Sequence, residues 1–467
     1  MAAGKANSYN TARAIEGKMY RHGLTMNHAC YNALIQAAST DTSNKTGKTV
    51  EYAKYWFDMM IKNNHVPDVG TYNMLIGAYA RNDDPKMAME FLEKIQEAKL
   101  DPDVTSWNSA LQAFANVGDV NGANNLLKRM GKAGIKFDER NITAMVICHS
   151  KAGNFEKSEQ WFQQFEKWNV TPTIHSYESV LAAFAQDGNS CRAIWWFDRM
   201  RDTQCVDVKI HHYNFVLESF ARAGDSAGAV RFFDRLTNDC ADATKNDSAK
   251  SFASALKLNV HVFGTLLEAI RADNNRFANS SEASENERSK TAIKYAELMK
   301  LNGIELNFHI YKAVMCCLAK DHDIGGVENW LQMAQRNKVT IFADIFGDII
   351  EEFVNSGAIY LAEQWCNKTI NDFELTPLVI FFHPIIRGHA EARNPEKAII
   401  WFNELLKVNL TPTFESYRYV INALKATGRH EEAQYWAGRA HQSGVVIPRE
   451  AREENDDFNK IPIEMSG

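Results

Sequence analysis

The stretch PDVGTYNMLIGAYARNDDPKMAMEFLEKIQEAKLDPD, residues 67–103, aligns with PDVTSWNSALQAFANVGDVNGANNLLKRMGKAGIKFD, residues 102–138, at an offset of 35 residues. The same frame continues past residue 173. Self-similarity at a fixed period of this length is the signature of a repeat architecture. The repeat therefore decides the fold of the 467-residue chain.

Eleven repeats fit this frame, and the last one ends at Pro448. Successive starts differ by 41, 35, 35, 35, 36, 50, 48, 35, 36 and 35 residues. The three longer intervals indicate insertions, which we expect at 39–49, 239–254 and 273–290 as exposed, mobile loops. The repeats start at His28, Val69, Val104, Glu139, Ile174, Ile210, Val260, Phe308, Ala343, Val379 and Phe414.

Each repeat contains two segments in which apolar residues recur at spacings of three and four, which predicts two amphipathic helices. In the second repeat these residues are Tyr72, Leu75, Ile76 and Tyr79, followed after a break by Ala88, Phe91 and Ile95. A single helical hairpin cannot bury both apolar faces, so neighbouring hairpins must stack. The pattern predicts an all-α solenoid of about eleven helix-turn-helix repeats of about 35 residues.

The ends of the chain depart from the repeat. Residues 1–27 match a second helix whose first helix is missing, so we expect a partial repeat there. Residues 449–467 hold three basic and six acidic side chains without periodicity, which predicts an acidic tail. The N-terminal sequence lacks the apolar stretch of a signal peptide and the Arg- and Ser-rich character of an organelle presequence. It therefore belongs to a chain that is not imported, or to a mature or partial chain.

Composition excludes several classes of protein. The formal net charge is −6, so any attraction to a nucleic acid must come from local patches. No stretch approaches about 18 uninterrupted apolar residues, so we expect no membrane insertion. The eight cysteines never fall in a C-x-x-C arrangement, which argues against a zinc knuckle or a redox dithiol and favours buried thiols in a reducing compartment.

These repeats, with the opening PDVGTYNMLI, a Gly or Asn/Asp break, an apolar second helix and a closing P-D, resemble the pentatricopeptide repeat (PPR) family over residues 28–448. The tetratricopeptide repeat is the nearest competitor, but its period is one residue shorter and its W-x-x-L-G opening is absent. The resemblance implies a right-handed superhelix that binds single-stranded RNA with its first helices, about one base per repeat, inside mitochondria or plastids.

In the family, the fifth and last residues of a repeat read one base. An Asn amide offers a donor and an acceptor to the base, and a neighbouring Asp can orient it. Asn with Asp resembles a uracil reader, so the first three repeats predict a preference for U-U-U. The base-reading pairs here are Asn32/Asp68, Asn73/Asp103, Asn108/Asp138, Thr143/Thr173 and Asn214/Asn259. As an alternative, the fifth-position Asn side chains only satisfy backbone groups at helix N-termini.

A second feature of the family is a basic residue at the thirteenth position, which can contact the RNA backbone. Arg81, Lys151, Arg222 and Lys320 occupy it here. The first 138 residues carry 16 basic and 14 acidic side chains, and the remainder carries 36 against 44. We therefore expect affinity for phosphate to lie toward the N-terminal half.

The second position departs from the family, which usually places a branched aliphatic residue there to wedge between bases. Only Ile380 fits this rule. The residues at this position are Ala29, Gly70, Thr105, Arg140, His175, His211, His261, His309, Asp344, Ile380 and Glu415. From the seventh repeat onward the base-reading positions also hold unrecognised pairs. We therefore expect residues 28–259 to bind RNA and residues 260–448 to form a degenerate, protein-docking half.

Three further patterns have structural interpretations. Seven tryptophans recur at one place in the second helices and are expected in the core rather than in a base-stacking ladder. His211 and His212 lack a third metal ligand in the sequence, so we expect no metal site. TGKT at 46–49 lacks the preceding strand and the glycine of a phosphate-binding loop. The tryptophans are Trp56, Trp161, Trp196, Trp330, Trp365, Trp401 and Trp436.

No catalytic constellation is present, so we expect a protein that is not an enzyme and uses neither a cofactor nor a small-molecule substrate. Two functions remain open. The first is an organellar single-stranded RNA-binding protein that prefers U-rich sequence and acts in RNA processing, stability or translation. The second is a scaffold or accessory subunit of a large organelle assembly, such as a ribosome or a membrane complex.

Overall fold

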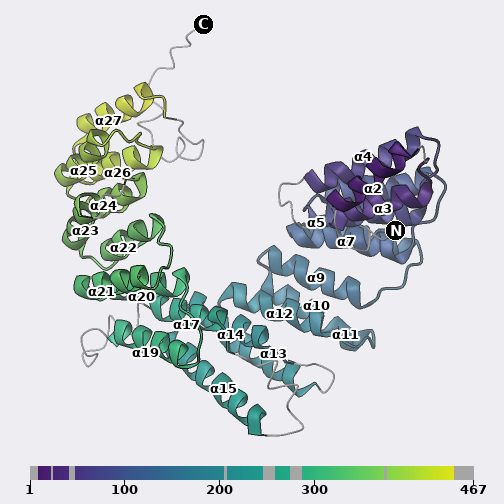
Figure 1. Ribbon diagram of the computed structural model, residues 1–467, viewed down its shortest axis with the longest axis horizontal. Helices are drawn as coiled ribbons and strands as arrows, with labels where there is room; N and C mark the ends of the chain where they lie inside the picture. Colours follow the sequence, from purple (N-terminus) through teal and green to yellow (C-terminus); the bar gives the residue numbers. More distant parts are fainter. Residues whose placement is uncertain are drawn as a thin grey trace. The chain divides into compact units, whose positions relative to one another are not determined.

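The computed structural model describes residues 9–22, 25–40, 48–203, 208–245, 258–273, 287–372 and 376–445. All regular structure assigned in these residues is helical (Figure 1). The predicted acidic tail lies outside the described residues, as do most of the three predicted insertions. The all-α repeat fold is confirmed.

The first helices of the repeats begin at the predicted positions, with one exception. The ninth begins at Asp344, one residue after the predicted start, because Ala343 is its N-cap. The first helices are α3 (His28–Thr40), α5 (Val69–Arg81), α7 (Val104–Val117), α9 (Glu139–Lys151), α12 (Ile174–Asp187), α14 (Ile210–Ala223), α17 (Val260–Ala272), α20 (Phe308–Lys320), α22 (Asp344–Asn355), α24 (Val379–Glu391) and α26 (Phe414–Ala426).

Each first helix is followed by a second helix, and in the fourth repeat this helix is interrupted at Gln163. The second helices are α4 (Lys48–Lys62), α6 (Pro85–Glu97), α8 (Val120–Lys132), α10 (Phe155–Phe162) with α11 (Gln164–Lys167), α13 (Ser190–Asp202), α15 (Ser226–Lys245), α19 (Glu287–Leu301), α21 (Ile324–Arg336), α23 (Ile359–Asn371), α25 (Pro395–Lys407) and α27 (His430–Gln442). The predicted partial repeat contributes α2 (Tyr9–Arg21), which packs on α3.

All three predicted loops overlap helix ends. Helix α3 continues through Thr40 and α4 begins at Lys48, so both ends of the expected loop at 39–49 are helical. Helix α15 continues through residue 245, so the expected loop at 239–254 begins inside a helix. Helix α19 begins at Glu287, so the end of the expected loop at 273–290 is also helical, and Asp273, Arg288 and Ser289 are buried. Polar composition alone could not distinguish these helix ends from a loop.

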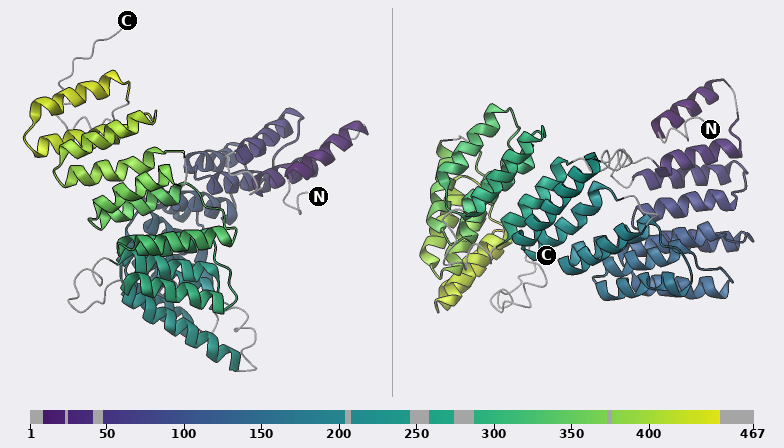
Figure 2. Two further views of the ribbon diagram at one scale, coloured as in Figure 1. Left: turned by 60° about the vertical axis from the view of Figure 1, so that its left-hand side comes forward. Right: turned by 90° about the horizontal axis from the view of Figure 1, so that it is seen from below.

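The chain forms two compact bodies. The N-terminal body comprises residues 1–222 and 239–256, and the C-terminal body comprises residues 223–238 and 257–467. Within each body, first helices pack on the next first helix, as α5 does on α7 and α20 on α22, and second helices pack on the first helix of the following repeat, as α6 does on α7 and α25 on α26. Figure 2 shows these stacked hairpins. The first helices thus form one layer of the stack and the second helices the other.

The break between the two helices of a repeat takes a left-handed turn. Gly118 caps the C-terminus of α7 with φ of 74°, a conformation that glycine adopts without strain. A Cβ at this position would lie 3.0 Å from the backbone nitrogen of Ala152 in the next repeat. The glycine therefore provides both the turn and the close approach of neighbouring repeats.

The repeated tryptophans lie in the core, as predicted. Six of the seven are buried, and Trp161 is half-buried. Trp196 of the fifth repeat contacts Phe162 of the fourth edge-to-face, with ring centroids 4.5 Å apart. These rings connect neighbouring hairpins. Among the described residues, no helix has both the length and the apolar character needed to cross a bilayer.

We expect Trp196→Ala to lower the free energy of unfolding by about 3–5 kcal/mol, because the side chain is only 1% exposed and its removal leaves a cavity between repeats. The preceding residue provides the control. Trp195 is 46% exposed, so Trp195→Ala should change stability by less than about 1 kcal/mol. Urea denaturation followed by circular dichroism measures both, and equal losses would contradict the packing role.

Candidate nucleic-acid interface

The last residue of a repeat caps the first helix of the next repeat. Oδ1 of Asp68 accepts a hydrogen bond from the backbone N–H of Thr71 at 2.7 Å, and Oδ1 of Asp103 accepts one from Ser106 at 2.8 Å. Asp138 accepts bonds from two backbone N–H groups of α9. These carboxylates satisfy donors that have no partner inside their helices.

The fifth-position amide of one repeat joins this cap in the next repeat. The Ser106 hydroxyl donates to Oδ1 of Asn73 at 2.6 Å, while Nδ2 of Asn73 donates to Asp103 at 3.0 Å. One amide N–H and one lone pair of Asn73 therefore remain for a ligand. The amide is held in a single orientation before any ligand arrives.

The third repeat makes the same arrangement with an amide in place of the hydroxyl. Nδ2 of Asn141 donates to Oδ1 of Asn108 at 2.7 Å, and Nδ2 of Asn108 donates to Asp138 at 3.1 Å. The first repeat differs, because Asn32 accepts from Thr71 at 2.9 Å but its amide nitrogen lies against His28 rather than Asp68. The expected orientation of Asn by Asp thus occurs in the second and third repeats.

The expected base-reading side chains are not equally accessible. Asn32 and Asn73 are half-buried, whereas Asn108 is 9% exposed and Thr143 only 3%. Asn214 is also buried and belongs to the N-terminal body. Its expected partner Asn259 belongs to the C-terminal body, where it caps α17 by accepting from the backbone of Val262 at 3.1 Å.

The fourth repeat uses a carboxylate that the sequence analysis did not identify. Oε1 of Glu139, the first residue of α9, accepts hydrogen bonds from Thr143 at 3.1 Å, Thr173 at 2.8 Å and Ser176 at 3.0 Å. Both expected base-reading threonines therefore direct their hydroxyl protons toward Glu139. An acidic residue at the first position, with hydroxyls at the positions it can reach, is the signal that could have indicated this site.

A second carboxylate occupies the fifth position of the fifth repeat. Oε1 of Glu178 lies 2.8 Å from Nε2 of His211 and 3.1 Å from Nε2 of His212. The fold therefore brings a third possible metal ligand to the two histidines, which the sequence pattern did not reveal. Nδ1 of His212, however, accepts from the backbone N–H of Lys209 at 2.9 Å. Nε2 of His212 must then carry the proton and donate to Glu178, which leaves no lone pair there for a metal.

Two of the capping carboxylates, Asp68 and Asp103, have lowered pKa values. Burial alone would raise the pKa of Asp103, but hydrogen bonds from the backbone N–H of Ser106 and from the Asn73 amide outweigh it. Asp68 shows the same balance, with Thr71 and His28 lowering its pKa. Both groups are therefore ionised at neutral pH and place fixed negative charge beside the amides.

The expected backbone-contacting residues divide into two kinds. Arg81 donates to the carbonyl of Ser39 at 2.9 Å, and Lys320 donates to the carbonyl of Arg271 at 2.8 Å. Each carbonyl belongs to the twelfth residue of the preceding first helix. Each of these side chains therefore caps the C-terminus of the first helix in the repeat before its own. Lys320 also lies 3.5 Å from Glu352 and is 11% exposed, which argues against a contact with RNA. Lys151 and Arg222 are exposed.

Within the N-terminal body, net positive charge on the first helices is found only in the first four repeats. Helices α3, α5, α7 and α9 carry three basic residues, Arg81, Arg140 and Lys151 included, and one acidic residue, Glu139. Helices α12 and α14 carry three acidic residues and one basic residue. On the first helices of residues 28–223, the net charge is therefore positive before about residue 152 and negative after it.

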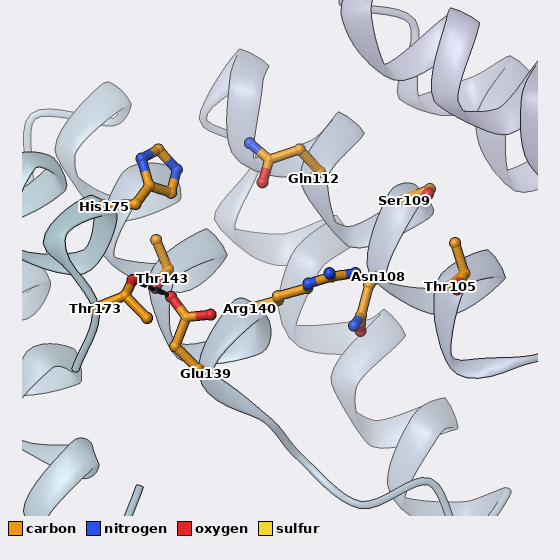
Figure 3. Close-up of a pocket in the computed structure, with 9 residues that line it drawn as sticks. All are labelled: Thr105, Asn108, Ser109, Gln112, Glu139, Arg140, Thr143, Thr173 and His175. Carbon is orange, nitrogen blue, oxygen red and sulfur yellow. Dashed lines mark hydrogen bonds between the residues drawn. The ribbon is translucent and has the colours of Figure 1, made fainter. Parts of the chain in front are cut away.

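A cavity of about 360 Å³ lies over the third, fourth and fifth repeats (Figure 3). Residues from the second position alternate with base-reading residues along it. Arg140 and His175 are exposed and lie where the family places its wedges, and both side chains can stack on a base. The lining residues are Thr105, Asn108, Ser109, Gln112, Glu139, Arg140, Thr143, Thr173 and His175.

The corresponding cavity in the C-terminal body is acidic. It lies between α22 and α24, has a volume of about 370 Å³, and is lined by Asp344, Asp348 and Glu351 together with His383 and apolar groups. The same place in the repeat thus carries an arginine in one body and three carboxylates in the other. Two of these carboxylates pair with cations on the first helices, Asp348 with Lys312 and Glu351 with Arg387.

Comparison with known proteins agrees with this geometry. A family model described as the pentacotripeptide-repeat region of PRORP matches residues 3–153 and 123–252, which together cover more than half of the chain. The chain belongs to the pentatricopeptide repeat family. The family predicted from the repeat pattern is therefore confirmed.

Two relatives show how far the similarity extends. A chloroplastic pentatricopeptide repeat-containing protein of Arabidopsis thaliana is 26% identical over 181 residues, which are 38% of this chain and 21% of that protein. The crystal structure of the maize pentatricopeptide repeat protein PPR10 with an 18-nucleotide psaJ RNA element superposes with a TM-score of 0.64 at 17% identity. That match covers 98% of this chain and 66% of PPR10, so this chain spans only part of either relative.

Replacement of a capping carboxylate should be destabilising in a pH-dependent way. We expect Asp103→Ala to lower the free energy of unfolding by about 1 kcal/mol at pH 7, because the N-terminus of α7 loses its cap. The folded-state pKa of Asp103 lies below its ordinary value of 3.8, so this contribution is present above pH 3.8. It should disappear as the pH falls through the lower, folded-state pKa.

Urea denaturation at pH 7 and at acidic pH measures the difference. Asp101→Ala is the matched control, because Asp101 is exposed two residues away and outside the cap. A loss of stability that is the same at both pH values, or equal in the two variants, would contradict the assigned role.

Proposed function

We propose that this chain binds single-stranded RNA along the first helices of its first four repeats. The observation that carries the proposal is the oriented amide of Asn73, fixed by Ser106 and Asp103 on the face shared by successive first helices. The amide of Asn108 is held in the same way. Regularly spaced side chains, each with a donor and an acceptor left over, suit a row of unstacked bases.

Uracil is the base that we propose for these positions. Its N3–H and O4 groups complement the remaining lone pair and N–H of an Asn amide. The resemblance to the family, in which Asn with Asp pairs with uracil, supports the same choice. Three consecutive Asn/Asp pairs then favour a U-rich segment.

The cellular role that we propose is post-transcriptional: processing, stability or translation of a transcript inside a mitochondrion or plastid. Two relatives support it. PPR10 was crystallised with RNA, and the Arabidopsis relative is chloroplastic. Nothing in the proposed interface supplies chemistry, so the protein would act by occupying the RNA or by recruiting partners to it.

A binding titration tests the base preference. We expect purified protein to bind a U-rich single strand more tightly than an A-rich strand, because each oriented amide complements uracil. A variant carrying Asn32→Ala, Asn73→Ala and Asn108→Ala should lose this preference, with a loss of about 1–3 kcal/mol per base contact. Fluorescence anisotropy at two salt concentrations measures both affinities.

The matched control carries Asn121→Ala, Asn125→Ala and Asn329→Ala, three exposed amides on the second helices α8 and α21. It should retain the wild-type preference. Binding of both RNAs at the same weak, salt-sensitive level by wild type and variants alike would refute the base-reading proposal.

The location of the interface has a separate test. Arg140→Ala with Lys151→Ala should weaken binding to every sequence, because these cations face the proposed path of the RNA and form no ion pair within the described part of the chain. The slope of log affinity against log salt should fall in magnitude by about 0.7 for each lost phosphate contact. Arg418→Ala is the control, since Arg418 pairs with Glu415 in the C-terminal body and should leave the slope unchanged. A smaller slope for Arg418→Ala, with no change for the Arg140→Ala and Lys151→Ala variant, would indicate an interface on the C-terminal repeats.

A scaffold function is the second candidate, favoured by the acidic cavity between α22 and α24. We propose that the C-terminal repeats dock on a protein of an organelle assembly, in addition to or in place of RNA binding at the N-terminal repeats. Copurification with ribosomal particles that survives nuclease treatment would support this function. Recovery of the protein with RNA alone would argue against it.

A further inference from the structure

The fourth repeat presents a different chemistry to the RNA from the three repeats before it. Its fifth and last residues, Thr143 and Thr173, each have a hydroxyl that could donate or accept. Both donate to Oε1 of Glu139, and the hydroxyl of Ser176 does the same. These three hydroxyl protons are therefore directed toward Glu139 and not toward a ligand.

The other carboxylate oxygen of Glu139 faces the cavity. All hydrogen bonds that Glu139 receives among the described residues end on Oε1. Figure 3 shows the second oxygen pointing away from the two threonines, and Glu139 is one of the residues that line the cavity. Because Thr143 is 3% exposed, the groups that Glu139 and the two threonines offer to a ligand are Oε2 of Glu139 and the hydroxyl oxygen of the exposed Thr173. Both are acceptors.

This surface complements only one of the four bases well. The base-pairing edge of guanine has two adjacent donors, N1–H and the N2 amino group. Adenine and cytosine each present one amino group beside an acceptor, and uracil presents one N–H between two carbonyls. A surface of acceptors can satisfy both guanine donors, whereas it leaves at least one acceptor of the other bases against an acceptor of the protein.

We propose that Glu139 is a specificity-determining residue that makes the fourth repeat select guanine and reject uracil. The proposal rests on the proposed RNA-binding function and extends it. Arg140 lies beside Glu139 at the second position, where its guanidinium can stack on the same base or contact its phosphate. The ligand then becomes a run of uracils followed at the next repeat by guanine.

The experiment compares four nine-nucleotide RNAs that differ only at the central position, U4-N-U4, where N is G, A, C or U. A single substitution in a uracil tract lets the RNA find its own register on the repeats. We expect wild-type protein to bind the G-containing strand about tenfold more tightly than the all-U strand, with A and C between them. Glu139→Gln should abolish this difference, because the side-chain amide presents a donor to the cavity and becomes compatible with uracil.

Glu93→Gln is the matched control, since Glu93 lies on the second helix α6, where it pairs with Arg129. It should keep the tenfold preference. Circular dichroism melting of the Glu139→Gln variant checks that the repeats remain folded. Wild-type protein that binds all four strands equally, or prefers U at the centre, would overturn the role of Glu139 while leaving RNA binding intact. Failure of every strand to bind would instead refute the proposed function itself.

Discussion

The structure depends on one hydrogen-bonded link, which runs from the fifth residue of a first helix to the capped N-terminus of the next. In the second repeat the link joins Asn73 to Ser106 and Asp103, and it sets the register of α5 against α7. A helix N-terminus has donors that its own helix cannot satisfy, so a cap is needed whether or not a ligand binds. The fifth-position side chain is therefore already fixed by folding, before any ligand is present. The rigid amide loses little conformational freedom on binding, which favours affinity.

The same link persists where the base-reading chemistry is absent. In the tenth repeat, Nε2 of His383 lies 2.6 Å from the Ser416 hydroxyl and 3.2 Å from that of Thr413. Burial lowers the pKa of His383, so the neutral imidazole makes this connection. The alternative interpretation of the fifth-position residues, in which they only serve the helix ends, thus describes this C-terminal repeat. In the first three repeats each Asn amide has groups left over after the link is made, so the link leaves room for the proposed recognition role.

The sequence predicted the helices closely because the apolar spacing and the capping residues are both local signals. It could not predict which polar groups meet across repeats. Glu139 and Ser176 are 37 positions apart, and their contact depends on the stacking distance rather than on any motif. Lys320 shows the opposite error: its position in the repeat matches the family rule, but the carbonyl of Arg271 and the buried Glu352 hold it inside the C-terminal body. The position of a residue in the repeat predicts where its Cα lies, but the partners of its side chain determine whether it can contact a ligand.

The first helices of the two bodies differ in whether most of their cations are paired with carboxylates. In the C-terminal body, cations on these helices lie within ion-pair distance of carboxylates on the same helical layer, namely Arg271, Lys312, Lys320, Arg387 and Arg418. Glu352 is 4% exposed, accepts a hydrogen bond from Arg271 and lies 3.5 Å from the ammonium of Lys320, so removal of either cation would leave a buried charge short of partners. All of these cations except Arg418, which pairs within α26, link one repeat to another, and their charge is already neutralised by carboxylates. Arg140 and Lys151 form no ion pair with any residue that the structure describes. A strand of RNA gains most from cations that folding has not already neutralised, which supports the proposal that it lies along the first four repeats.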